Sequence, residues 1–199
     1  MLKKTLYSIG IAAFVLTISA FQSVPSALAL SSLDDIEAGD LIRGENFSAV
    51  YYFGEDGFRY VFPNDKTYYT WYEDFDDVNW ISDGDLGTIQ IGGNVTYKPG
   101  SKMIKINSDP KTYAVGEGGS LHWVSTEDVA IALYGSTWNQ QIDDVSDGFF
   151  SNYSVSWHIE DADEYDTAGL QNSVKDINDD KNLSEATVIG INDNSFSNS

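Results

Sequence analysis

The residues whose types and spacing best suit a chemical task lie near the C-terminus, in the segment "DINDDKNLSEAT". Asp176, Asn178 and Asp180 occupy the first, third and fifth positions of an EF-hand-like loop, and carboxylate and amide oxygens are the ligands that calcium prefers. Lys181 stands where such a loop needs glycine, and Thr187 stands where it needs a bidentate glutamate. The three residues are candidate calcium ligands, but we expect an extended or irregular acidic segment whose module does not depend on calcium.

Aromatic side chains are the second candidate for binding chemistry, because tyrosine and tryptophan present a flat apolar face together with a polar tip. The chain holds 12 Tyr, 10 Phe and 5 Trp residues. Aromatic positions that recur in two similar stretches of the chain are expected in the core. Tyr68, Tyr69 and Trp80 do not recur, so they are the candidate surface residues for stacking on a carbohydrate.

Catalysis has little support in the sequence. His122 and His158 are the only histidines, and His122 stands in "LHWV", the pattern of a half-exposed strand position rather than of a general base. No GxSxG or HExxH motif is present, and a pair of carboxylates can always be chosen from 31 acidic residues. We therefore nominate no catalytic residue. An exported hydrolase of polysaccharide or peptide that uses an acidic pair is kept as the alternative.

The charge of the chain limits its partners. The formal net charge is −20, which disfavours binding to nucleic acid or to an anionic membrane surface. The absence of cysteine excludes disulfides, thiolate metal sites and a lipid-modified cysteine. Apart from calcium, no cofactor is indicated, and a cell-envelope polymer or a surface protein fits the charge as a partner.

The first 29 residues have the pattern of a secretory signal peptide. Lys3 and Lys4 precede an apolar run from Leu6 to about Ala20, and Ala27 and Ala29 hold the small-residue positions of a cleavage site. We expect cleavage after Ala29, a secreted or cell-surface location, and no membrane span in the mature chain. A membrane anchor is the alternative, although the apolar run is short for a spanning helix.

A sequence pattern that occurs twice in the chain is expected to form the elements that position the candidate aromatic residues. "GEDGFRYVF" from Gly54 matches "GEGGSLHWV" from Gly116 at an offset of 62 positions. Farther along, "ISDGDL" from Ile81 matches "VSDGFF" from Val145, where the offset has become 64. The order of the matches predicts an internal duplication, with repeat 1 at about 39–100 and repeat 2 at about 101–158.

Each repeat predicts a strand, a hairpin, a helix and a further helical turn. Aromatic and β-branched residues flank a glycine-bearing turn, which favours a hairpin. In repeat 2, Ser125 is the expected N-cap of a helix that stops at Gly135, and by analogy "DKTYYTWY" in repeat 1 is expected to be helical. We expect an α+β module over residues 30–158, mostly antiparallel, whose two pseudo-equivalent repeats share one core.

The remaining residues, 159–199, predict a largely flexible acidic tail. Acidic side chains far outnumber the basic ones there, and strong apolar periodicity is absent. Only "ATVIGI", from Ala186 to Ile191, has the composition of a strand.

Three stretches, "AVYYFGEDGFRYVFPNDKTYYTWY", "GGNVTYKPGSKMIKINSDPKTYAV" and "LHWVSTEDVAIALYGSTWNQQIDDVSDGFFSNY", carry a resemblance. Together they resemble an uncharacterised module of exported bacterial proteins, notably of candidate-phylum lineages with small genomes. The resemblance covers about Gly39 to Val155. It implies a secreted or surface-displayed module that often accompanies other extracellular domains, and it implies no catalytic residue. The expected function is therefore a non-catalytic binding or structural module of the cell envelope.

Overall fold

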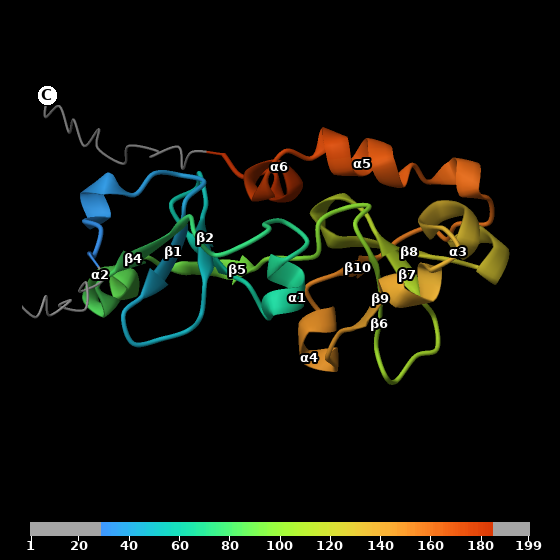
Figure 1. Cartoon of the computed structure of the whole chain (residues 1–199), viewed down its shortest axis with the longest axis horizontal. Helices are drawn as coiled ribbons and strands as arrows, with labels where there is room; N and C mark the ends of the chain where they lie inside the picture. Colours follow the sequence, from blue (N-terminus) through green and yellow to red (C-terminus); the bar gives the residue numbers. More distant parts are fainter. Residues whose placement is uncertain (1–28, 185–199) are drawn as a thin grey trace, which may run out of the picture.

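Two five-stranded sheets lie side by side along the long axis of the molecule, within residues 29–184 that the computed structural model describes (Figure 1). The first sheet has the order β4-β1-β2-β3-β5, with the strands β1 (Leu41–Gly44), β2 (Tyr51–Phe53), β3 (Arg59–Val61), β4 (Val78–Ile81) and β5 (Ile91–Asn94). The second has the order β9-β6-β7-β8-β10, with the strands β6 (Met103–Lys105), β7 (Tyr113–Val115), β8 (Ser120–Trp123), β9 (Ile142–Asp144) and β10 (Ser154–Val155).

The predicted α+β class is confirmed by these sheets and by the short helices around them. Two predictions lie outside the described residues. They are the strand at 186–191 and, except for its last residue, the signal segment 1–29.

The two sheets have the same topology, and the strand pairs of β1, β2 and β4 have the same register as those of β6, β7 and β9. Leu41 pairs with Tyr52 in the first sheet and Met103 pairs with Ala114 in the second, so both partners are displaced by 62 positions. The pairing of β2 with β3 and of β7 with β8 shows the same displacement throughout. The outer strands β4 and β9 are displaced by 64 positions. These are the two offsets of the sequence match, although duplication of an ancestral unit stays a prediction.

Each sheet is mixed. The inner strands form antiparallel pairs, whereas β4, β5, β9 and β10 pair in parallel with their neighbours. Parallel neighbours cannot be joined by a tight turn, and the chain reaches each of these edge strands through intervening elements. The prediction of a mostly antiparallel arrangement therefore holds for the hairpins only.

Short helices follow the hairpins, and their side-chain caps are local. Asn64 begins α1 and Thr126 begins α3, and each side-chain oxygen accepts the backbone N–H three residues later, at 2.8 and 3.2 Å. Thr126 takes the role that was predicted for Ser125. The helical elements of residues 33–150 are η1 (Leu33–Asp35), α1 (Asp65–Tyr68), α2 (Asp83–Thr88), η2 (Glu117–Gly119), α3 (Glu127–Tyr134), η3 (Trp138–Gln141) and α4 (Asp147–Phe150). Within residues 29–184, no helix has the length and apolarity needed to cross a membrane.

The hydrophobic core is divided between the two sheets, so the prediction of one shared core is wrong. Successive residues of a strand face opposite sides of its sheet. Leu41 packs into one cluster of buried side chains and Ile42 into another, and the equivalent Met103 and Ile104 are divided in the same way. Each sheet is therefore buried on both faces, which suits strands whose outer pairs are parallel.

Residues 160–184 form helices that run across both sheets (Figure 1), where a flexible tail was predicted. The helical elements are η4 (Ala162–Glu164), α5 (Thr167–Ser173) and α6 (Ile177–Lys181). Their acidic residues are placed as N-caps, with Asp161, Asp166 and Asp176 each accepting a backbone N–H. Tyr165 and Ile177 are buried in the clusters of the second and first sheets. Acidic content misled the prediction because several of these acids cap helices rather than face solvent.

Candidate binding groove

A groove of about 440 Å³, here called groove 1, opens between the first sheet and α4 of the second repeat. Its apolar lining comes from Val50, Val61, Phe62, Tyr68, Phe75 and Phe149. Its polar lining comes mainly from Ser48, Asn64, Asp65 and Asn94. Both repeats therefore contribute side chains to a single concave surface.

The aromatic wall of groove 1 is stacked in layers. Tyr68 is buried, and its hydroxyl donates to the Asp74 carbonyl at 2.6 Å. The ring of Phe75 stacks on Tyr68 with the centroids 4.2 Å apart. Phe75 is 44% exposed and Phe149 is 37% exposed. The buried tyrosine thus supports an open aromatic ring at the mouth of the groove.

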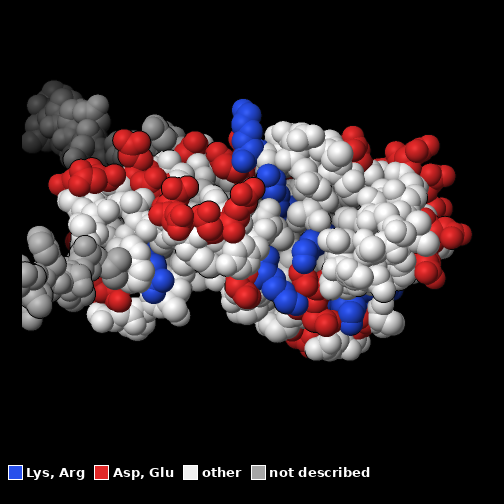
Figure 2. Space-filling view, in the orientation of Figure 1, with Lys and Arg blue, Asp and Glu red and all other residues white. Residues whose placement is uncertain are grey.

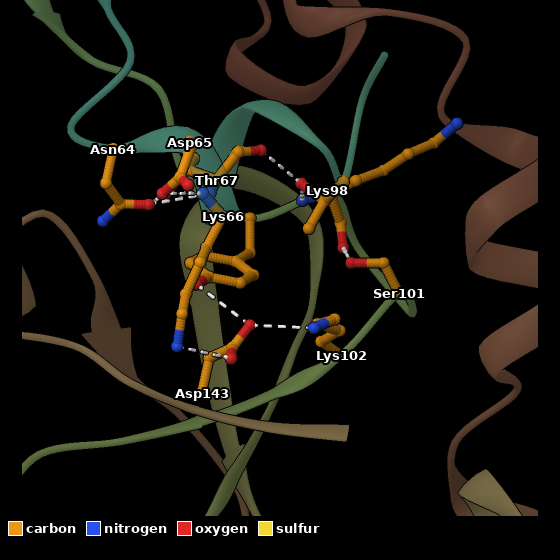
Figure 3. Close-up of polar contacts among 10 residues, drawn as sticks. Asn64, Asp65, Lys66, Thr67, Lys98, Ser101, Lys102 and Asp143 are labelled. Atoms are coloured by element: carbon orange, nitrogen blue, oxygen red, sulfur yellow. Dashed lines mark hydrogen bonds and ion pairs between the residues drawn. The ribbon is translucent and has the colours of Figure 1, made fainter. Parts of the chain in front are cut away.

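The polar rim of groove 1 combines amides with one carboxylate. The side-chain oxygen of Asn64 accepts the Thr67 backbone N–H, and its amide nitrogen points away from the helix (Figure 3). Asn94 donates to the side-chain oxygen of Asn152 at 3.1 Å. Asp65 is the only acidic residue in the lining, which holds no Lys, Arg or His. An aromatic face with amides and a carboxylate suits a neutral hydroxylated ring better than an anion.

An ion-pair cluster beside the groove joins α1 to the second sheet (Figure 3). The two oxygens of the buried Asp143 accept from Lys66 Nζ at 2.9 Å and from Lys102 Nζ at 3.0 Å. The Tyr97 hydroxyl lies 3.3 Å from the second oxygen. Figure 2 shows basic side chains gathered near the middle of the molecule, while acidic ones spread toward both ends. The cluster helps to hold α1, and with it one wall of groove 1, against the second repeat.

The surroundings of Asp143 keep it ionised. Burial alone would raise the pKa of this carboxyl, but hydrogen bonds from Lys66 and Lys102 outweigh burial, so the pKa lies below its usual value. The hydrogen bond to Asp143 in turn raises the pKa of Lys66. Asp143 and Lys66 are therefore both charged at neutral pH.

The three aromatic residues predicted as a surface site do not form one patch. Tyr68 is buried, so the prediction that it is exposed is wrong, although one side of its ring lines groove 1. Tyr69 is 53% exposed and lies edge-on to Phe75, 5.6 Å away. Trp80 is on the edge strand β4, where the guanidinium of Arg43 lies 3.8 Å above its ring.

Each of the predicted calcium ligands accepts a hydrogen bond from a different backbone N–H. Asp176 caps α6, Asn178 accepts the Glu55 N–H at 3.0 Å, and Asp180 accepts the Gly118 N–H at 2.9 Å. The segment is helical rather than extended or irregular, so that prediction is wrong for residues 177–181. Among the described residues, no three His, Cys, Asp or Glu side chains are grouped so that they could hold a metal ion. The predicted closing position, Thr187, lies outside residues 29–184.

His122 is buried rather than half-exposed as predicted. Its Nδ1 lies 3.2 Å from the Trp157 carbonyl, and its Nε2 lies 3.2 Å from the Ser120 hydroxyl. A proton on Nδ1 satisfies both contacts, because the serine then donates to Nε2. Burial lowers the pKa of His122. The backbone of Gly116 packs against this pair, since a Cβ there would stand 2.5 Å from the serine oxygen.

Sequence reasoning missed Phe75 and Phe149, which carry the exposed aromatic surface of groove 1. Phe75 stands alone among acidic residues in "YEDFDD", and an isolated aromatic residue in a polar loop was the available signal. Phe149 belongs to the other repeat, so its position at this groove depends on how the two repeats pack.

No protein-family model, curated protein or solved structure matches this chain.

Proposed function

We propose that this protein is a non-catalytic binding module of the cell envelope that holds a neutral carbohydrate segment in groove 1. The observation that carries the proposal is the open, supported ring of Phe75 beside amide and carboxylate groups. Sugar rings present apolar C–H faces and polar edges, and such a lining matches both. The expected signal peptide supports an extracytoplasmic location.

The charge of the protein narrows the ligand further. A chain of formal charge −20 repels polyanions, and a lining without basic side chains offers an anionic sugar no partner. A neutral polysaccharide is the envelope polymer that meets both conditions.

Binding is favoured over hydrolysis by the number of carboxylates in groove 1. Glycoside hydrolysis usually takes two carboxyl groups that flank the scissile bond, whereas Asp65 is the single acid among the lining residues. The groove geometry thus favours a module that holds a polymer over the alternative hydrolase.

Binding is tested with the purified protein and soluble neutral polysaccharides, namely xylan, mannan and hydroxyethylcellulose, by affinity gel electrophoresis and calorimetry. We expect binding to at least one of them, and Phe75→Ala should weaken it by about tenfold, the equivalent of about 1.4 kcal/mol. Asp65→Asn is a second variant that leaves the aromatic wall intact and should also weaken binding.

Phe47→Ala is the matched control, because Phe47 is an exposed phenylalanine outside groove 1. Thermal unfolding of each variant separates lost binding from lost folding. Retention by none of the three polymers would overturn the proposal. Release of reducing ends by the wild type, abolished in Asp65→Asn, would instead establish the hydrolase.

A further inference from the structure

A second groove lies on the other half of the molecule, between β8, α3 and Trp138, with a volume of about 220 Å³. Eight of the ten residues that line this groove 2 stand 62 positions after a residue that lines groove 1. The displacement is the same one that relates the pairs of the inner strands. The two grooves therefore occupy equivalent places in two units of the same fold.

Groove 2 has the same kinds of polar lining residue as groove 1, but its aromatic residues stand at different positions. Glu127 stands where groove 1 has Asp65, and it is likewise the only acid in the lining. Thr126 takes the capping role of Asn64. Groove 2 again holds no Lys, Arg or His.

Tryptophans supply the flat surface of groove 2. Trp123 stands at the position of Val61, and Trp138, 63 positions after Phe75, is the other aromatic residue of the lining. Ala130 stands at the position of the bulky Tyr68, so the aromatic side chains of groove 2 come from other positions of the unit. Lys111 Nζ lies 5.2 Å from the centroid of Trp123, which leaves Trp138 as the better stacking surface.

We propose that groove 2 is a second site for the ligand class of groove 1, so that one chain holds two segments of a neutral polysaccharide. This inference rests on the function proposed for groove 1. The occupant follows from what the linings share, which is aromatic rings, uncharged polar groups, one carboxylate and no base. An aromatic face with hydrogen-bonding groups and no cation suits neutral sugar rings.

The helix α6 fixes the two repeats relative to each other. Asn178 accepts from the first hairpin turn at Glu55, and Asp180 accepts from the second at Gly118. A ligand long enough to reach both grooves meets two sites at a set spacing, and the second contact is then intramolecular. A polymer should therefore bind more tightly than either groove binds a short oligosaccharide.

The test compares a short and a long form of each sugar by calorimetry: xylohexaose, mannohexaose and cellohexaose beside the three polymers. We expect two hexasaccharides per wild-type chain, with one of the two binding events about tenfold weaker in Phe75→Ala, the other about tenfold weaker in Trp138→Ala, and both weaker in the double variant. The polymer should bind the wild type at least tenfold more tightly than it binds either single variant. Glu127→Gln is a milder second variant for groove 2, and Trp157→Ala is the control, since Trp157 is exposed and lines neither groove.

The outcomes separate the two proposals. One hexasaccharide per wild-type chain, bound more weakly by Phe75→Ala and with unchanged affinity by both Trp138→Ala and Glu127→Gln, would exclude groove 2 as a site and leave the function of groove 1 standing. Binding to groove 2 alone, or to neither groove, would overturn the function of groove 1. Capture of an apolar peptide by groove 2 without any sugar would contradict the inference directly.

Discussion

Asp143 and Asp180 are both buried carboxylates, but their surroundings shift their pKa values in opposite directions. Two lysines hold the pKa of Asp143 below its usual value. Burial raises the pKa of Asp180, and the Gly118 N–H and Lys181 only partly oppose this. Ionised Asp143 therefore stabilises the folded protein. Ionised Asp180 destabilises it at neutral pH, because burial disfavours the charged form.

The raised pKa of Asp180 predicts a pH-dependent stability. Between the unfolded pKa of about 3.9 and the higher folded value, the folded protein binds more protons than the unfolded chain. The contribution of this group is therefore fully present below the unfolded pKa and is lost as the pH rises through the folded pKa. Asp180→Asn cannot titrate and keeps an acceptor for Gly118. Relative to wild type, this variant should gain stability from pH 4 to pH 7 in denaturant titrations.

Asp180→Ala is the control for the hydrogen bond. It leaves the Gly118 N–H and the Thr96 hydroxyl without this partner, which should cost about 1–3 kcal/mol at neutral pH. A stability of Asp180→Asn that follows the wild type at every pH would show that Asp180 keeps an ordinary pKa.

At the scale of the elements, the two hairpin turns each have a glycine at the equivalent position. Gly57 has φ +79° and Gly119 has φ +73°, a region that side chains with a Cβ rarely adopt. A Cβ on Gly57 would meet nothing within 4 Å. A Cβ on Gly119 would stand 2.9 Å from Thr96 Cγ2 and 3.3 Å from the Asn152 carbonyl oxygen. The same turn is therefore open in the first repeat and packed in the second.

This difference gives a matched pair of substitutions. Gly57→Ala should cost about 1–2 kcal/mol, because only the backbone conformation is strained. Gly119→Ala should cost more, since the methyl group must also displace Thr96 or the chain at Asn152. Chemical denaturation of both variants measures the difference. Equal losses would mean that the second turn relaxes around the methyl group.

At the scale of the whole molecule, the helices of residues 160–184, here called the strap, connect the two sheets. The strap contributes Ile177 to the core of the first sheet and Tyr165 to that of the second. Loss of one large buried side chain costs about 2–5 kcal/mol, and an entire domain is stable by only about 5–15 kcal/mol.

Removal of residues 160–199 should therefore abolish cooperative unfolding of the protein. Circular dichroism and calorimetry check this outcome. A chain that ends at Ser184 retains the described contacts of the strap and is the control. A shortened chain that still melts in one sharp transition near the wild-type temperature would show that the strap is dispensable.

Local features of the fold could be predicted from the sequence because they depend on few neighbouring residues. Glycine-bearing turns between aromatic and β-branched runs indicated both hairpins, and "EDVAIALY" before Gly135 indicated α3. The offsets of 62 and 64 positions recur in the strand register. Each of these signals is carried by short-range backbone preference or by direct comparison of the chain with itself.

Only the tertiary structure decided which distant segments meet. The parallel edge strands, the divided core and the entry of Phe149 into groove 1 all depend on long-range packing, which no local pattern encodes. Acidic composition concealed the strap, because a carboxylate that caps a helix and one that faces water look alike in a sequence. Tyr68 was misplaced for the same reason, since a tyrosine buried with a bonded hydroxyl and one on the surface differ only in their surroundings.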